Sequence, residues 1–260
     1  ETHQKLALVM DEFGGVMAIP NKTPSLYAFL PMEDRRYLFP FFINADFELS
    51  SNRQEAKKVS VWNEYLFYNI GKSIVSWVAS VATQKHSNYL LLLPNTFFTE
   101  ELEESKIDRL AAQFNRGYKE SLTCTPFILN DKEEIVCQSD IILDESGFAN
   151  IIDASDFCNL YGTRKRLVNK AINSKPLNNT SIFSEIEHLQ IGNVVECILD
   201  KSNRFSILRY WLSISSELRK LLLKHIAEMP GNKKNLDNQL SDIPAFASKG
   251  KLYSFNKLLA

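Results

Sequence analysis

The chain has 260 residues, of which 45% are hydrophobic and 23% charged, a composition that is typical of a folded protein and excludes disorder over most of its length. Its 30 basic and 31 acidic residues give a formal net charge of -1, which argues against the strongly basic surface of a nucleic-acid-binding protein. The longest apolar run, at residues 89–94, is far shorter than the roughly 18 residues that a membrane span requires. We therefore expect neither nucleic acid nor a membrane as a partner.

The cysteines and histidines, the residue types that most often bind zinc or form disulfides, are scattered along the chain. The four cysteines and four histidines form no CxxC pair and no local cluster; they are Cys124, Cys137, Cys158, Cys197, His3, His86, His188 and His225. This spacing favours neither a zinc site nor a disulfide framework. The first residues lack the basic, apolar and small-residue segments of a secretory signal, so we expect a cytoplasmic protein. From their strand-like pattern we expect the native protein to begin further upstream.

The first fifty residues contain three signals for β-structure. Residues 6–12 and 16–20 flank a Phe-Gly-Gly turn at residues 13–15, which predicts a hairpin with glycine where φ is positive. Residues 25–32 predict a second strand that ends at Pro31, and residues 37–51 predict an aromatic strand that runs into a polar loop. The N-terminal part of the chain is therefore expected to be rich in sheet.

Helical periodicity begins at Trp62. Apolar residues recur at three- and four-residue steps from Trp62 to Val81, which predicts a helix that packs one face on the sheet. Beyond a polar stretch at residues 85–88, the pattern predicts a short apolar strand and four helices, at residues 90–94, 99–121, 154–161, 181–189 and 204–227. The predicted fold class is therefore α+β, with a boundary between residues 1–84 and 85–260.

Two segments of the second half share a plan. Those that begin at Thr125 and at Ile243 each contain a proline, an apolar strand, a charged turn, a second short strand and the start of a helix. The two segments align with a one-residue gap. A repeated hairpin-and-helix unit is more typical of a scaffold than of a catalytic device.

The sequence contains none of the short motifs that mark a P-loop, a dinucleotide-binding turn, a hydrolase serine or a zinc-protease helix. The residue that suggests chemistry is Arg53, in a polar loop between the aromatic strand and the Trp62 helix. A guanidinium just ahead of a helix N-terminus is suited to bind a phosphate. On residue type alone, the alternative is that Arg53 pairs with Glu48 or Glu55, or caps a backbone carbonyl.

Four landmarks surround this loop in order: FLPM at residues 29–32, NADF at 44–47, NRQ at 52–54 and WNEYL at 62–66. Their order resembles the region that follows the nucleotide-binding domain in sacsin-like members of the GHKL class of ATPases (gyrase, chaperone, histidine kinase, MutL). The hairpins near Pro126 and Pro244 extend a weaker similarity over the rest of the chain. The resemblance implies a transducer-like sheet (ribosomal protein S5 domain 2-like) with helices in residues 1–84, followed by a second α+β region.

The resemblance also implies a role for Arg53. In the related ninety-kilodalton heat-shock chaperones, the arginine of this loop reaches the γ-phosphate of ATP that the preceding domain holds, and Arg53 stands in that position. Asn52 and Gln54 replace the Ser and Glu that are usual there. The parent protein is therefore expected to bind ATP and Mg upstream of Glu1, whereas this fragment is expected to bind no cofactor and to have no activity by itself.

Two functions are consistent with these observations. In the first, the fragment couples ATP binding in the upstream domain, its expected partner, to a conformational change that acts on protein clients. In the second, the fragment is a non-catalytic protein-interaction scaffold without nucleotide contact, its hairpin-and-helix units bind a partner, and Arg53 is only structural.

Overall fold

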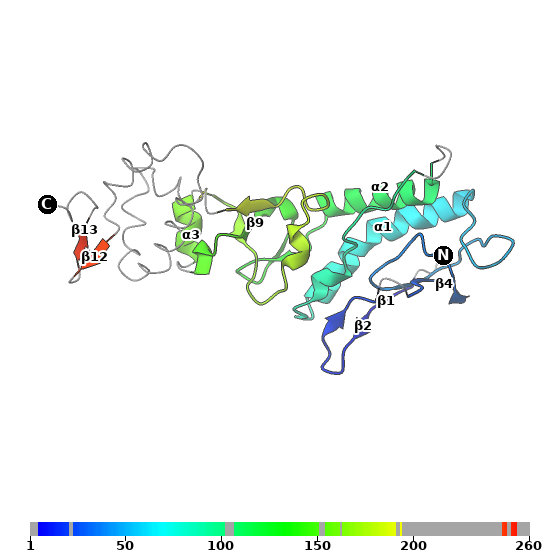
Figure 1. Ribbon diagram of the computed structural model, residues 1–260, viewed down its shortest axis with the longest axis horizontal. Coiled ribbons are helices and arrows are strands. Elements are labelled where there is room, and N and C mark those ends of the chain that lie inside the picture. The colour runs from blue at the N-terminus through cyan, green and yellow to red at the C-terminus, as the bar shows by residue number, and fades with distance from the viewer. Residues whose placement is uncertain are drawn as a thin grey trace. The chain divides into compact units, whose positions relative to one another are not determined.

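A computed structural model describes residues 5–20, 23–101, 107–150, 154–161, 163–190, 193, 246–248 and 251–253 (Figure 1). The chain divides into two compact units, the first formed by residues 1–141 and 168–186, the second by residues 142–167 and 187–260. The described elements combine helices with small sheets, so the predicted α+β class is confirmed. Within these described ranges, no helix combines the length and the hydropathy of a membrane span.

A four-stranded sheet forms one layer of the first unit. Its strands are ordered β1 (Lys5–Ala7), β6 (Phe42–Asn44), β4 (Leu26–Ala28) and β5 (Leu30–Pro31); β4 and β6 are parallel, and the other two pairs are antiparallel. The strand predicted over residues 25–32 therefore folds back on itself, at Phe29, which has a φ of 66°. Pro31 lies in the edge strand, where the absence of an amide hydrogen is tolerated.

The predicted N-terminal hairpin is confirmed. It consists of β2 (Val9–Met10) and β3 (Val16–Met17), which pair antiparallel. Gly14 takes the expected positive φ of 79°, and the Asp11 carboxylate accepts hydrogen bonds from the backbone nitrogens of Phe13 and Gly15, at 2.9 and 2.6 Å. Turn chemistry of this kind is local, which is why the sequence predicts it.

Two helices, α1 (Val61–Ala82) and α2 (Arg109–Cys124), pack side by side in the first unit (Figure 1). A Cβ atom on Gly71 would stand 2.8 Å from the Tyr118 backbone nitrogen and nearer still to the Phe114 carbonyl oxygen. On the partner helix, a Cβ atom on Gly117 would collide with the Tyr68 carbonyl oxygen. The two glycines therefore allow the helix backbones to touch.

An aromatic core joins the sheet layer to both helices. The segment that leads into β6 supplies one ring of each pair, and α1 or α2 supplies the other. The pairs are Tyr37–Phe67, Phe41–Trp77 and Phe39–Phe114, with centroids 4.7, 4.8 and 5.1 Å apart. The helix predicted from Trp62 to Val81 is confirmed as α1, with its apolar face in this core. Trp62 itself remains 37% exposed.

The first unit departs from the sequence predictions at three places. The apolar strand predicted at residues 90–94 is wrong, because Tyr89–Leu92 form the short 3-10 helix η1, in which Leu90 and Leu92 are buried by packing rather than by strand pairing. The helix predicted from residue 99 begins only at Arg109, where Asp108 caps it. The boundary predicted after residue 84 does not coincide with the division of the units, because α1 and α2 lie on either side of it and pack together.

Both predicted hairpins of the repeated plan are present. β7 (Ile128–Leu129) pairs antiparallel with β8 (Ile135–Val136), and β12 (Phe246–Ser248) pairs antiparallel with β13 (Lys251–Tyr253). The helix expected after the first hairpin is wrong, because the 3-10 turn η3 (Gln138–Asp140) leads directly into a strand. The corresponding part of the second copy lies outside the described residues.

The second unit contains a three-stranded sheet, in the order β10 (Arg166–Leu167), β9 (Ile141–Asp144) and β11 (Glu187–Leu189), and the helix α3 (Ala154–Tyr161). The helix predicted at residues 154–161 is therefore confirmed. The helix predicted at residues 181–189 is wrong, because its last residues pair in parallel with β9 as β11. The helix predicted at residues 204–227 lies outside the described residues. The short 3-10 helix η4 (Phe148–Asn150) also belongs to this unit, whereas η5 (Lys175–Asn178) belongs to the first.

Candidate functional site

Arg53 lies at the turn of a compact loop, which we call the Arg53 loop and define as residues 49–56. An antiparallel bridge between Leu49 and Ala56 closes its base. Inside the loop, the Ser50 carbonyl accepts a hydrogen bond from the Arg53 backbone nitrogen, and the Glu55 carbonyl accepts one from the Ser50 nitrogen, both at 2.9 Å. The φ of Arg53 is 57°, in the left-handed region that residues other than glycine adopt rarely. The backbone of the loop is therefore well defined.

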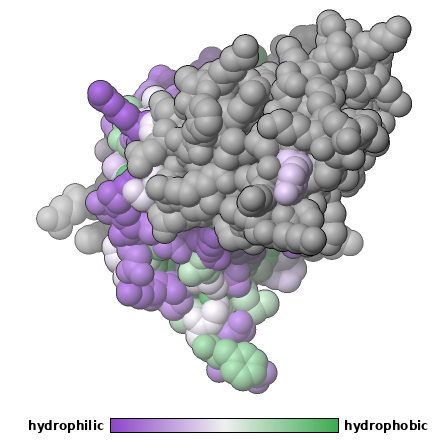
Figure 2. All heavy atoms as spheres, turned by 90° about the vertical axis from the view of Figure 1, so that its left-hand side faces the viewer, coloured by the Kyte–Doolittle hydropathy of each residue, from purple (hydrophilic) through white to green (hydrophobic). Residues whose placement is uncertain are grey.

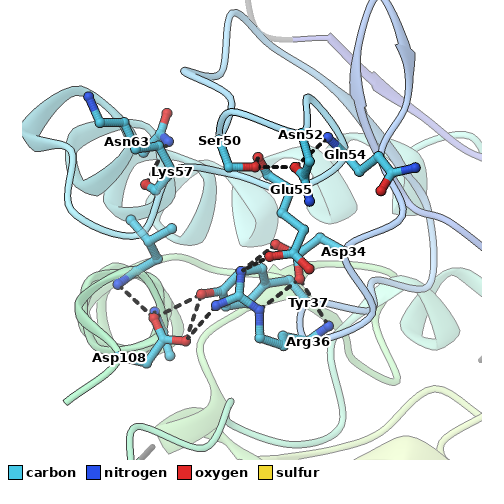
Figure 3. Close-up of polar contacts among 12 residues, drawn as sticks. Asp34, Arg36, Tyr37, Ser50, Asn52, Gln54, Glu55, Lys57, Asn63 and Asp108 are labelled. Atoms are coloured by element: carbon cyan, nitrogen blue, oxygen red, sulfur yellow. Dashed lines mark hydrogen bonds and ion pairs between the residues drawn. The ribbon is translucent and has the colours of Figure 1, made fainter. Parts of the chain in front are cut away.

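Asn52 stabilises this turn. Its side-chain oxygen accepts a hydrogen bond from the Gln54 backbone nitrogen at 3.0 Å and a second one from the Ser50 hydroxyl (Figure 3). A serine side chain makes the same kind of turn, although more weakly. Asn52 therefore makes the local hydrogen bonds that shape the loop, as a serine at this position would.

The Arg53 side chain is exposed, and neither of the predicted carboxylate partners binds it. Glu48 instead accepts a hydrogen bond from the Ser60 hydroxyl at 2.9 Å and lies 3.7 Å from the Lys57 ammonium. Glu55 lies 4.0 Å from the Arg36 guanidinium. Within the described part of the chain, the guanidinium of Arg53 makes no hydrogen bond or ion pair and faces solvent.

Asn63, in the first turn of α1, fastens the base of the loop to the helix (Figure 3). It is fully buried, and its side-chain nitrogen donates to the carbonyls of Glu48 and Lys57, at 2.8 and 3.0 Å. Its side-chain oxygen accepts from the Glu48 backbone nitrogen at 2.9 Å. The loop is thus held to α1 at both of its ends.

The structure brings the four sequence landmarks together. The side chain of Asn44 accepts a hydrogen bond from the Phe29 backbone nitrogen at 3.4 Å, which joins the first landmark to the second. The Trp62 indole nitrogen donates to the Asp46 carbonyl at 2.7 Å, which joins the second to the fourth. Asn63 joins the fourth to the loop that contains the third. The landmarks therefore form one connected structural region.

A buried polar network that the sequence does not predict lies beside the loop (Figure 3). The Arg36 guanidinium donates to both oxygens of Asp34, at 2.9 and 2.6 Å, and the Tyr37 hydroxyl contacts both oxygens of Asp108, at 2.8 and 2.7 Å. Burial raises the pKa of Tyr37, and the hydrogen bond to Asp108 raises it further. Burial lowers the pKa of Arg36, but the interactions with Asp34, Tyr37 and Asp108 outweigh this effect and leave the pKa raised.

The interactions of this network stabilise the fold. Asp108 is the N-cap of α2 and accepts hydrogen bonds from the backbone nitrogens of Leu110 and Ala111. The charges of both buried carboxylates are balanced by hydrogen bonds and by Arg36, as buried charges require. Among the described residues, no group of three or more His, Cys, Asp or Glu side chains is arranged to hold a metal ion.

The sequence contains only a partial signal for this network. Asp108 stands two residues ahead of Leu110, where the apolar helical pattern begins and an N-cap is expected. Nothing local connects it to Tyr37, from which it is 71 residues distant. The link between network and loop is also tertiary, since the Gln54 carbonyl accepts a hydrogen bond from the Glu33 backbone nitrogen at 2.9 Å.

Comparison with known proteins identifies no relative of this chain. No protein-family model matches the chain, and neither the curated proteins nor the solved structures give a significant match. The assignment to the sacsin-like family therefore stays a prediction, and the site is interpreted from the geometry of its own residues.

Proposed function

We propose that this chain is the region downstream of the nucleotide-binding domain in a sacsin-like ATPase of the GHKL class, and that Arg53 senses the γ-phosphate of ATP. A transducer-like fold of the N-terminal region is part of this proposal. The observation that carries it is an exposed guanidinium on an ordered loop, beside two carboxylates that are both engaged by other groups.

An arginine in this state is suited to an incoming phosphate. Its side chain has no intramolecular partner to exchange among the described residues, so binding costs only its desolvation and the ordering of the side chain. The planar guanidinium can donate two parallel hydrogen bonds to phosphate oxygens and stabilise the charge that develops during phosphoryl transfer. The hydrogen-bonded loop reduces the entropy that would otherwise be lost in placing the group.

The mechanism that follows is a two-state switch. Arg53 would bind the γ-phosphate of ATP held, with Mg, by the upstream domain, and the loop would transmit its displacement to α1 through Asn63. Since α1 packs backbone to backbone on α2, the two helices move as one body. The movement is then available to act on protein clients of the parent protein.

The experiment replaces Arg53 by Ala and by Lys in the full-length protein. We expect R53A to lower kcat for ATP hydrolysis about 10²- to 10³-fold, the range for loss of one charge-stabilising donor, with little change in ATP affinity. R53K should lie between R53A and the unmodified protein, because a lysine keeps the charge but not the planar fork. The control is K58A, which removes an exposed cation close by in the chain and should leave turnover unchanged.

The alternative is a non-catalytic interaction scaffold, and exposed apolar residues favour it. Phe29 is 92% exposed at the β4–β5 turn, and Phe13 is 89% exposed at the tip of the β2–β3 hairpin. Figure 2 shows a mostly hydrophilic described surface from which an apolar group protrudes at the lower end. In the scaffold, these two side chains would be apolar contacts for a partner, since aromatic residues are enriched in protein interfaces. Unchanged ATP turnover in R53A would exclude the sensor and favour the scaffold.

A further inference from the structure

We infer that Asn63 is a positioning residue for Arg53, an inference that rests on the proposed function. Its buried amide fixes both ends of the Arg53 loop on the first turn of α1 and thereby sets the direction in which the guanidinium projects.

The hydrogen bonds of the Asn63 side chain reach only backbone atoms. Two of them, at 2.8 and 2.9 Å, hold the carbonyl and the nitrogen of Glu48, where the chain enters the loop; the third, at 3.0 Å, holds the carbonyl of Lys57, where it leaves. The backbone hydrogen bond from the Lys57 nitrogen to the Glu48 carbonyl lies between these contacts. A side chain bonded in this way sets the position of the loop base relative to the helix axis, whatever side chains the loop bears.

The other attachments of the loop are weaker or more exposed. Glu55 and Arg36 are 4.0 Å apart, and both side chains are partly open to solvent, where ion pairs contribute little. A single backbone hydrogen bond joins Gln54 to Glu33. Asn63 is fully buried and uses both donors and its acceptor, so its contacts are strengthened by the low local dielectric.

The chain contains a matched control in Asn115. This residue lies in α2, is also buried, and accepts from the Phe98 backbone nitrogen at 3.0 Å while donating to the Phe98 carbonyl at 2.9 Å and to Glu100 at 2.8 Å. It belongs to the same unit and makes the same number of hydrogen bonds, but it fastens a different segment. A change at Asn115 therefore reproduces the loss of stability without touching the Arg53 loop.

The test compares N63D with N115D, each alone and combined with R53A, in the full-length protein. Each aspartate keeps the acceptor and loses both donated bonds. N115D also brings a carboxylate next to Glu100, so N63S and N115S, which add no charge, complete the comparison. We expect N63D to lower kcat by up to about 10²-fold, the cost of misplacing a catalytic group by about 1 Å, with KM for ATP nearly unchanged. Combined with R53A, it should lower kcat no further. N115D should leave kcat unchanged with Arg53 present and with Ala in its place.

A second measurement needs no ATP turnover. Amide hydrogen exchange of residues 49–56 in this chain should be faster in N63D than in the unmodified protein, and unchanged in N115D. If N63D does not fold, N63S and N115S give the same comparison without an added charge.

The possible results distinguish the proposed function of Arg53 from the positioning role of Asn63. Normal turnover in R53A overturns the proposed function. If R53A lowers turnover but N63D lowers it by the same factor in both backgrounds, or if exchange in the loop is unaffected by N63D, Asn63 does not position Arg53 and only this inference is overturned.

Discussion

The contact between α1 and α2 provides the sharpest test of the fold, through substitution of Gly71 by Ala. The added methyl carbon would stand 2.8 Å from the Tyr118 backbone nitrogen and nearer still to the Phe114 carbonyl oxygen. Both obstacles are backbone atoms of a helix, so no side chain can rotate away to make room. The helices have to separate, and because ordinary contacts between carbon and oxygen begin at about 3.3 Å, the separation exceeds about 0.5 Å.

The magnitude follows from two opposing effects. Alanine is a better helix former than glycine by about 1 kcal/mol, which stabilises the variant. A gap of about 0.5–1 Å forfeits a quarter to a half of the dispersion energy of the contacts that it opens, and insertion into a packed core costs typically about 1–3 kcal/mol, or more when the backbone must move. We therefore expect G71A to lower the free energy of unfolding by roughly 2 kcal/mol after the helix-propensity gain is included.

Urea unfolding followed by circular dichroism measures this change, provided that the slope with denaturant stays constant. The control is S76A at an exposed position of α1, which should change stability by less than about 0.5 kcal/mol. G117A should also destabilise, and the double variant should lose less than the sum, because one separation of the helices relieves both clashes. If G71A were more stable than the unmodified protein, helix propensity would dominate and the close backbone approach would be refuted.

Two further predictions concern buried polar groups. Burial raises the pKa of Tyr89 to about 12 from its ordinary 10.0, whereas the hydrogen bond from the Leu129 nitrogen lowers it. The stability contributed by the neutral phenol is therefore complete below pH 10.0, and roughly 3 kcal/mol is lost as the pH rises to the folded value. Y89F should flatten this part of the alkaline unfolding profile in urea titrations at graded pH. D108A removes the N-cap of α2 and leaves the buried hydroxyl of Tyr37 without its acceptor. In thermal unfolding, it should lower the free energy of unfolding by about 2–4 kcal/mol. D108N keeps an acceptor and should lower it clearly less. Equal losses in D108A and D108N would assign the effect to charge alone.

The local features of this protein are predictable from its sequence. The three- and four-residue spacing that begins at Trp62 predicts α1, because it repeats with the period of a helix. Turn residues predict the β2–β3 hairpin, because an aspartate and a glycine act within four positions of each other. The loop that contains Arg53 is also predictable, since a polar stretch between a strand and a helix is typical of a loop.

The tertiary structure alone decides the features that join distant parts of the chain. Glu187–Leu189 form a strand because β9 offers a parallel edge, although their own pattern favours a helix. Tyr37 meets Asp108 across 71 residues, and Gly71 meets the backbone of α2, and neither contact leaves a trace in the periodicity of the sequence. The sequence likewise leaves the partners of Glu48 and Glu55 open, and in the folded chain these carboxylates contact Ser60, Lys57 and Arg36 rather than Arg53. Periodicity and turn chemistry act between neighbours within about four residues, whereas these partners are chosen by the free energy of packing the whole unit.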